Sequence, residues 1–167
     1  MFERILVGFD GSAPARRAVQ VASEMAGRFG SILTIAMVLP PTRGEDYGRL
    51  ETLVPLTDDG RTLATLLDEL REHARARGVR VVEPVTLRGE VLESLLDYLN
   101  RNPQDLVVVG SRGLSRGRRL LLGSVSTGLV NSAHCPVLVV RHGPPHLSRP
   151  PTHSEAHPTR SATGGAG

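Results

Sequence analysis

Two kinds of segment alternate along the chain between residues 4 and 140. Short runs rich in branched apolar residues are typical of buried strands, and longer stretches with apolar residues every three or four positions are typical of helices. The strand-like runs lie at 4–9, 32–39, 79–87, 106–109 and 136–140, and the helix-like stretches at 12–30, 60–77, 89–100 and 124–134. This alternation predicts an α/β fold with parallel strands and right-handed crossovers. Because the strands are continuously apolar, we expect helices on both faces of the sheet.

Two segments fall outside this pattern. Residues 42–59 are polar and irregular, and a connection of this length is either a flap over a binding site or a solvated insertion. Residues 143–167 contain five prolines and almost no large apolar residue, so they cannot bury enough surface to fold. We therefore expect one folded domain over 1–142 and a disordered tail over 143–167, whose histidines lack a rigid scaffold for a metal ion.

The stretch 106–126 carries the residues best suited to chemistry. Its apolar run ends at Gly110. Gly113 follows after two intervening residues and Gly123 after nine more, and Ser124 then begins a helix. Glycines permit positive φ and let a ligand approach bare amides, and the first amides of a helix have no internal partner. The pattern predicts a phosphate site with Ser124 as the N-cap and Ser126 adding a hydroxyl. The alternative is an ordinary strand-to-helix connection that needs glycine for its turns.

Composition narrows the chemistry of such a site. All twenty basic residues are arginine, which excludes a Walker A lysine and leaves amides, hydroxyls and arginine to bind phosphate. A net charge of +3, 3% aromatic residues and no tryptophan argue against nucleic-acid binding, although the run RGLSRGRR (112–119) keeps that alternative open. The single cysteine, Cys135, excludes an internal disulfide, and we expect it to pack at the entrance of a strand.

Three motifs resemble the universal stress protein family. The G-2x-G-9x-G-(S/T) signature of its nucleotide-binding branch is matched by Gly110, Gly113, Gly123 and Ser124. The family's opening and closing motifs are similar to VGFDGS (7–12) and CPVLVV (135–140). The resemblance extends from Phe2 to Arg141, and it implies a single-domain, open, Rossmann-like, parallel five-stranded sheet with strand order 3-2-1-4-5. In that order the first and fourth strands meet at the topological switch point, where ligands bind at the carboxyl ends.

The resemblance also implies ATP as the ligand. Ser124 and Ser126 could ligate Mg²⁺ through a bound triphosphate. The phosphates would be held mainly by the backbone amides of Gly110, Gly113, Gly123, Ser124, Val125 and Ser126. Asp10 would accept hydrogen bonds from the ribose, although it could instead serve as a helix cap. Ala36 would contact adenine, although it could equally be a core residue. Arg112 lies where it could reach a phosphate.

The family resemblance further implies a regulatory, stress-response function with little or no turnover. The sequence offers no histidine near a nucleophile in the glycine loop and no cluster of acids for two metal ions. The alternative is a slow ATP hydrolase or nucleotidyl transferase on the same fold, for which Asp10 is the candidate base. We also expect a homodimer paired through the last strand, 137–140, whose apolar edge needs cover. With no membrane-spanning apolar run and no signal peptide, a cytoplasmic location is expected.

Overall fold

The computed structural model of the protein describes residues 2–39, 62–111 and 122–141. Arg112, Gly113, the segment 42–59 and the predicted tail 143–167 lie outside these residues. The elements follow in the order β1 (Arg4–Gly8), α1 (Ala13–Phe29), β2 (Ile32–Leu39), α3 (Leu63–Arg75), β3 (Val81–Arg88), α4 (Val91–Arg101), β4 (Leu106–Gly110), α5 (Ser124–Ser132) and β5 (Val137–Val140). The predicted alternation of strands and helices is confirmed.

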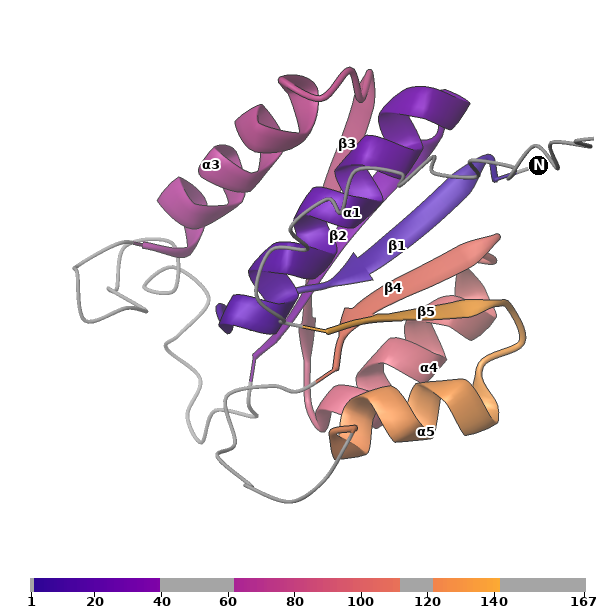
Figure 1. Ribbon diagram of the computed structural model, residues 1–167. Coiled ribbons are helices and arrows are strands. Elements are labelled where there is room, and N and C mark those ends of the chain that lie inside the picture. The colour runs from indigo at the N-terminus through magenta and orange to yellow at the C-terminus, as the bar shows by residue number, and fades with distance from the viewer. Residues whose placement is uncertain (1, 40–61, 112–121, 142–167) are drawn as a thin grey trace, which may run out of the picture.

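The strands of the described residues form one parallel sheet in the order β3-β2-β1-β4-β5 (Figure 1). This is the order implied by the family resemblance. β1 lies at the centre, where Val7 pairs with Ile35 of β2 and with Val108 of β4. The chain leaves β1 toward β2 and β3 on one side and later returns to β4 and β5 on the other. The topological switch point therefore falls between the carboxyl ends of β1 and β4.

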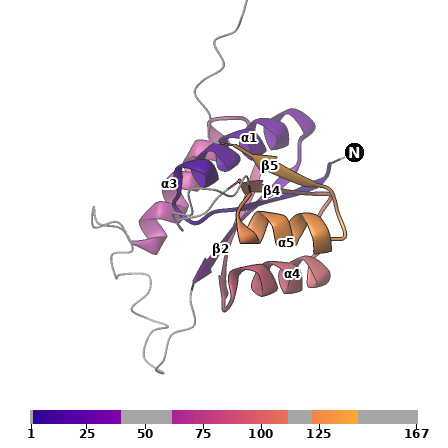
Figure 2. The same ribbon diagram turned by 60° about the horizontal axis from the view of Figure 1, so that its bottom comes forward.

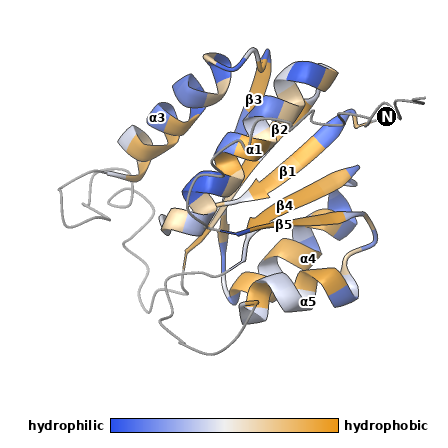
Figure 3. Ribbon diagram, in the orientation of Figure 1, coloured by the Kyte–Doolittle hydropathy of each residue, from blue (hydrophilic) through white to orange (hydrophobic). Residues whose placement is uncertain are grey.

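Helices cover both faces of the sheet, as expected, with α1 and α3 on one face and α4 and α5 on the other (Figures 1 and 2). Successive strand residues alternate between the two interiors because side chains of a strand point to opposite faces. Ile5, Val7 and Val108 belong to the core beneath α1 and α3, whereas Leu6 and Val107 belong to the core beneath α4 and α5. β1, β2, β4 and β5 are accordingly hydrophobic along most of their length, whereas β3 also carries Glu83, Thr86 and Arg88 (Figure 3). Each helix has polar residues on its outer side (Figure 3).

Most predicted boundaries differ from the observed ones by one to three residues, and for two of them the local backbone gives the reason. The third strand starts at Val81 and not at Val79, since the Val79 amide still donates to the Ala74 carbonyl at 3.3 Å in the turn after α3. The last helix ends at Ser132 and not at residue 134, because Ala133 has an extended backbone with ψ of 142°.

At the amino ends of the strands, Asp105 ties the start of β1 to the start of β4. Its Oδ2 accepts the backbone amides of Glu3 at 2.7 Å and Arg4 at 2.9 Å. These hydrogen bonds, that of Arg4 first, hold the pKa of the Asp105 carboxyl below its ordinary value. The two strands that flank the switch point are thus joined at the opposite end as well as along the ladder. No helix within the described ranges is both long and apolar enough to cross a bilayer.

Candidate functional site

The candidate site lies at the carboxyl ends of β1 and β4, at the end of the sheet where α1 and α5 begin (Figure 1). After β1, the short segment Phe9–Ser12 leads into α1. After β4, Ser111 is the last described residue before the chain resumes at Leu122 and enters α5. Two helix N-termini therefore follow the two central strands, and residues far apart in the sequence come together around them.

Gly110 brings the end of β4 against the start of α1. A Cβ at this position would lie 2.8 Å from the carbonyl carbon of Pro14 and 2.9 Å from the amide nitrogen of Ala15. Contacts this short with backbone atoms leave no room for any side chain. Gly110 is also absent from the described glycines with positive φ, so a left-handed backbone is not what requires glycine there. The contact between β4 and α1 is thus the physical reason for glycine at this position.

The helix α5 begins at Ser124, and its N-cap residue is Gly123, with φ of −75° and ψ of 165°. The prediction that Ser124 is the N-cap was wrong. Helical hydrogen bonding starts one residue earlier, because the Thr127 amide donates to the Gly123 carbonyl at 3.0 Å. Ser124 is then the first helical residue and its side chain is exposed. The amides of Ser124, Val125 and Ser126 precede that first intrahelical bond and lie at the positive end of the helix dipole.

Hydrogen bonds join the start of α5 to the end of β4. The Gly123 amide donates to the Ser111 carbonyl at 2.7 Å, and the Ser111 amide donates to the Val140 carbonyl at 2.8 Å. Ser126, which is only 2% exposed, donates its hydroxyl inward to the carbonyls of Gly123 at 3.0 Å and Ser111 at 3.4 Å. The start of α5 is therefore held next to β4 through Gly123 and Ser126, and the Ser126 hydroxyl faces the protein.

Asp10 is exposed at the end of β1, next to the start of α1. Its Oδ1 accepts the amide of Ser12 at 3.0 Å across Gly11, which has a φ of 84°. Ser12 is the N-cap of α1, and its hydroxyl accepts the Ala15 amide at 3.3 Å. Asp10 thus orders the turn before the helix without being the cap residue. Its carboxylate lies on the same edge of the sheet as the α5 amides.

Ala36 lies inside the fold and is 1% exposed. It pairs with Gly8 of β1 and Val85 of β3, and its carbonyl accepts the Phe9 amide at 2.8 Å. Its side chain belongs to the core beneath α4 and α5. The core alternative for Ala36 describes this position.

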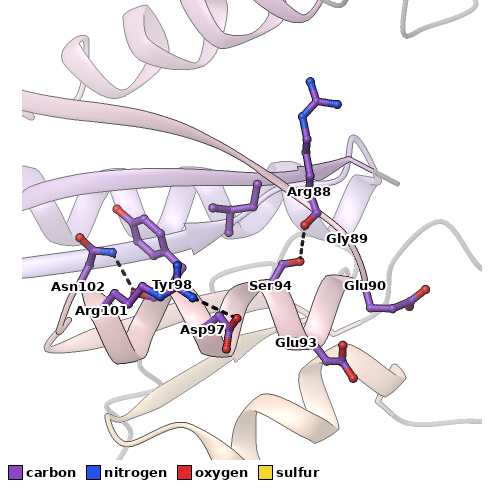
Figure 4. A pocket seen from close by; sticks show the side chains of 10 residues that line it. Arg88, Gly89, Glu90, Glu93, Ser94, Asp97, Tyr98, Arg101 and Asn102 are labelled. Atoms are coloured by element: carbon purple, nitrogen blue, oxygen red, sulfur yellow. Dashed lines mark hydrogen bonds and ion pairs between the residues drawn. The ribbon is translucent and has the colours of Figure 1, made fainter. Parts of the chain in front are cut away.

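A groove of about 400 Å³ lies elsewhere, between the end of β3 and helix α4 (Figure 4). Within it the Ser94 hydroxyl donates to the Arg88 carbonyl at 3.1 Å, and Arg101 pairs with Asp97 at 3.6 Å. Its lining includes both negatively charged carboxylates and positively charged guanidinium groups. None of the predicted site residues lines it. The groove is therefore separate from the candidate site at the carboxyl ends of β1 and β4.

The model of the universal stress protein family matches residues 1–141 of the chain. The chain belongs to the universal stress protein family. A Thermus aquaticus universal stress protein, from the QAH/OAS sulfhydrylase 3′ region, is 34% identical over 144 residues, which cover 84% of this chain and 100% of that protein. The Bacillus subtilis universal stress protein YxiE is 29% identical over 155 residues, covering 84% of this chain and 100% of the relative.

Solved universal stress proteins share the fold. A universal stress protein in complex with cAMP is 28% identical, with a TM-score of 0.68, and the match covers 83% of this chain and 97% of that one. The universal stress protein UspA from Lactobacillus plantarum is 26% identical, with a TM-score of 0.67 and coverage of 84% and 98%. The single-domain, open parallel sheet expected from the sequence is thus the architecture of these relatives.

Sequence reasoning missed one residue of this universal stress protein's site, Ser111. It lies between two glycines of the signature as an unspecified position, so the motif gives no signal for it. The structure makes it the junction of β4, β5 and α5, because its amide and carbonyl bond to Val140 and Gly123. The motif accepts any side chain at position 111. Ser111 acts through its backbone amide and carbonyl, and a motif of side-chain types gives no information about such a role.

Proposed function

We propose that this universal stress protein binds an adenine nucleotide, ATP with Mg²⁺ in the first instance, at the edge between β1 and β4. We further propose that it acts in the cytoplasm as a nucleotide-dependent regulatory protein in stress response, with little or no turnover. One observation carries the proposal. The amides of Ser124, Val125 and Ser126 open a helix directly beside the carboxyl end of β4, at the switch point of the sheet.

The chemistry of this edge suits a nucleotide phosphate. Amides at a helix N-terminus donate to anionic oxygens, and the helix dipole favours negative charge there. The chain has no lysine, so a phosphate held here depends mainly on backbone amides. The sequence pattern assigns Arg112 and Gly113 to the phosphates as well. Gly110 would contribute indirectly, by letting the start of α1 pack closely against β4, because the space where its side chain would lie is occupied by Pro14 and Ala15.

The ribose and the base are assigned less directly. Asp10 is exposed on the same edge, and a carboxylate there accepts hydrogen bonds from ribose hydroxyls well. The contact of Ala36 with adenine rests on the family resemblance alone, because its side chain lies in the core and its carbonyl is already bonded to Phe9. The relative solved with cAMP, at 28% identity, supports an adenine nucleotide as the ligand class.

The alternative is a slow ATP hydrolase or nucleotidyl transferase on the same fold. Hydrolysis would require a group that orients water, and Asp10 is the candidate that the sequence offers. In the structure Asp10 bonds to the Ser12 amide, which fixes its carboxylate in the turn before α1. Product release well above one turnover per minute, abolished by Asp10→Ala, would favour the enzyme.

A direct test of the binding function is mass spectrometry of the small molecules released from freshly purified, denatured protein. We expect an adenine nucleotide at a substantial fraction of one molecule per chain, and calorimetric binding of added ATP after the protein is stripped. A protein that releases no nucleotide and gives no heat with ATP, ADP, AMP or cAMP would contradict the proposal.

We also propose that the protein forms a homodimer through β5, and the two free edges of the sheet differ in a way that supports this. On β3, the Gly89 amide donates to the Leu39 carbonyl of β2. The backbone groups of successive strand residues point to opposite sides, so those of Pro84 point away from β2. Because proline has no N–H, Pro84 interrupts the hydrogen-bonding capacity of this free edge. On β5, the carbonyls of Pro136 and Val140 face β4, so Val137 and Val139 present their backbone groups to the outside. This second edge is apolar and contains no proline or charge from Val137 to Val140.

Substituting Val139→Pro should therefore convert a dimer to a monomer, because it removes an outward amide without touching the ladder to β4. The measurement is size-exclusion chromatography with light scattering. Thr86→Pro is the matched control, since Thr86 is exposed on β3 and its amide also faces outward. A wild-type protein with one chain per particle would refute the dimer, and a Val139→Pro dimer would refute this edge.

A further inference from the structure

Ser126 lies in the first turn of α5, but its side chain points away from the candidate phosphate position. The residue is 2% exposed, and its hydroxyl donates to the carbonyl of Gly123 at 3.0 Å and to that of Ser111 at 3.4 Å. A serine hydroxyl has one proton, and here that proton is shared between two backbone carbonyls. Phosphate oxygens only accept hydrogen bonds. The Ser126 hydroxyl in this arrangement has no proton to give to a phosphate.

The two carbonyls that receive this proton belong to the two ends of the connection between β4 and α5. Ser111 continues β4, and its amide is fixed to the last residue of β5, Val140. Gly123 is the N-cap of α5, and its amide donates to Ser111 at 2.7 Å. The Ser126 hydroxyl therefore closes a small ring of bonds that fastens the first turn of α5 to the central sheet.

We propose that Ser126 is a positioning residue of the nucleotide site: its side chain fixes the start of α5 against Ser111 so that the amides of Ser124–Ser126 present a preformed cradle to phosphate. The inference rests on the proposed function and assigns the side chain a task distinct from binding. Preformed donors are effective because they are ordered before the anion arrives. Without the hydroxyl, the carbonyls of Gly123 and Ser111 lose this hydrogen-bond donor, and the amides must be ordered by the ligand itself.

The neighbouring side chains provide matched comparisons. Ser124 is exposed on the first helical residue and Thr127 is exposed one position beyond Ser126. The Thr127 hydroxyl occurs in the same turn, so a general effect of removing a hydroxyl from the start of α5 would appear in Thr127→Ala as well as in Ser126→Ala. A positioning role predicts an effect that is specific to Ser126 and specific to the phosphates of the ligand.

The test measures the affinity of wild type, Ser126→Ala and Thr127→Ala for ATP and, separately, for adenosine, by calorimetry and competition. Since a buried neutral hydrogen bond is lost, Ser126→Ala should weaken ATP binding by about tenfold. Adenosine, which has no phosphate, should bind within about twofold of wild type, as should both ligands with Thr127→Ala. Amide hydrogen exchange at Gly123 should accelerate in Ser126→Ala with or without ligand, because its bond to Ser111 is no longer braced.

Three outcomes would overturn the inference, and they can be told apart. Equal loss of ATP and adenosine affinity in Ser126→Ala would show that the hydroxyl only supports the fold. Unchanged ATP affinity with unchanged Gly123 exchange would show that the hydroxyl is dispensable. Absence of ATP binding in the wild-type protein would reject the proposed function as well, whereas the first two outcomes leave that function standing.

Discussion

Gly110→Val is expected to destabilise the folded protein by about 2–4 kcal/mol in the absence of any ligand. The Cβ of the new side chain would lie 2.8–2.9 Å from Pro14 and Ala15, and two of those contacts are with backbone atoms. Backbone atoms cannot rotate out of the way, so β4 and α1 must separate. Urea denaturation followed by circular dichroism measures the effect, and Gly110→Ala should already give part of it because it supplies the same Cβ.

Gly123→Ala is the control for this experiment. Gly123 has a φ of −75° and a ψ of 165°, an extended conformation that other residues adopt without strain. We expect Gly123→Ala to change the free energy of unfolding by no more than about 1 kcal/mol, the ordinary effect of an N-cap substitution. If Gly110→Val were as stable as wild type, the close contact between β4 and α1 would not be what requires glycine at 110.

Gly123→Val should have the opposite effect: loss of nucleotide affinity by about a hundredfold or more, roughly 2.7 kcal/mol, with the fold retained. A branched side chain at the N-cap would stand beside the amides of Ser124–Ser126, where the phosphates are proposed to lie. The backbone conformation of Gly123 permits valine, so the sheet and the helix should remain intact. Calorimetry with ATP measures the affinity, and the urea midpoint of the same sample verifies the fold.

A smaller loss with Gly123→Ala would provide a graded series, because only the branched methyl groups differ. Gly113→Val is expected to behave like Gly123→Val, on the sequence pattern alone, since residue 113 lies outside the described residues. ATP affinity unchanged in both valine variants would reject the assignment of the phosphates to this edge.

The two glycines show why one signature can combine unlike requirements. Gly110 and Gly123 both belong to the motif, yet the first is required by contact with another helix, whereas the second is the N-cap of α5, where the ligand is proposed to bind. A variant series that treats them alike would confuse loss of folding with loss of binding. Measuring stability and affinity on each variant separates the two.

The sequence by itself determined the elements of this protein. The apolar run 32–39 became β2 (Ile32–Leu39) with the predicted limits, and the helix-like stretch 12–30 contains α1 (Ala13–Phe29). Such features are local, because the periods of a strand and a helix are properties of the backbone and are written directly into side-chain spacing. Strand order did not follow from periodicity. It came from the family resemblance, which the match over residues 1–141 supports.

Only the tertiary structure decided how the residues of the candidate site are used. Which residue caps α5, which way the Ser126 hydroxyl points, and why residue 110 is glycine all depend on contacts between segments remote in the sequence. The interior place of Ala36 likewise follows from its two neighbouring strands. A pattern of residue types records that a position must be small or hydroxylated. Whether a ligand or a neighbouring helix imposes that requirement is fixed by packing, because packing alone determines what occupies the adjacent space.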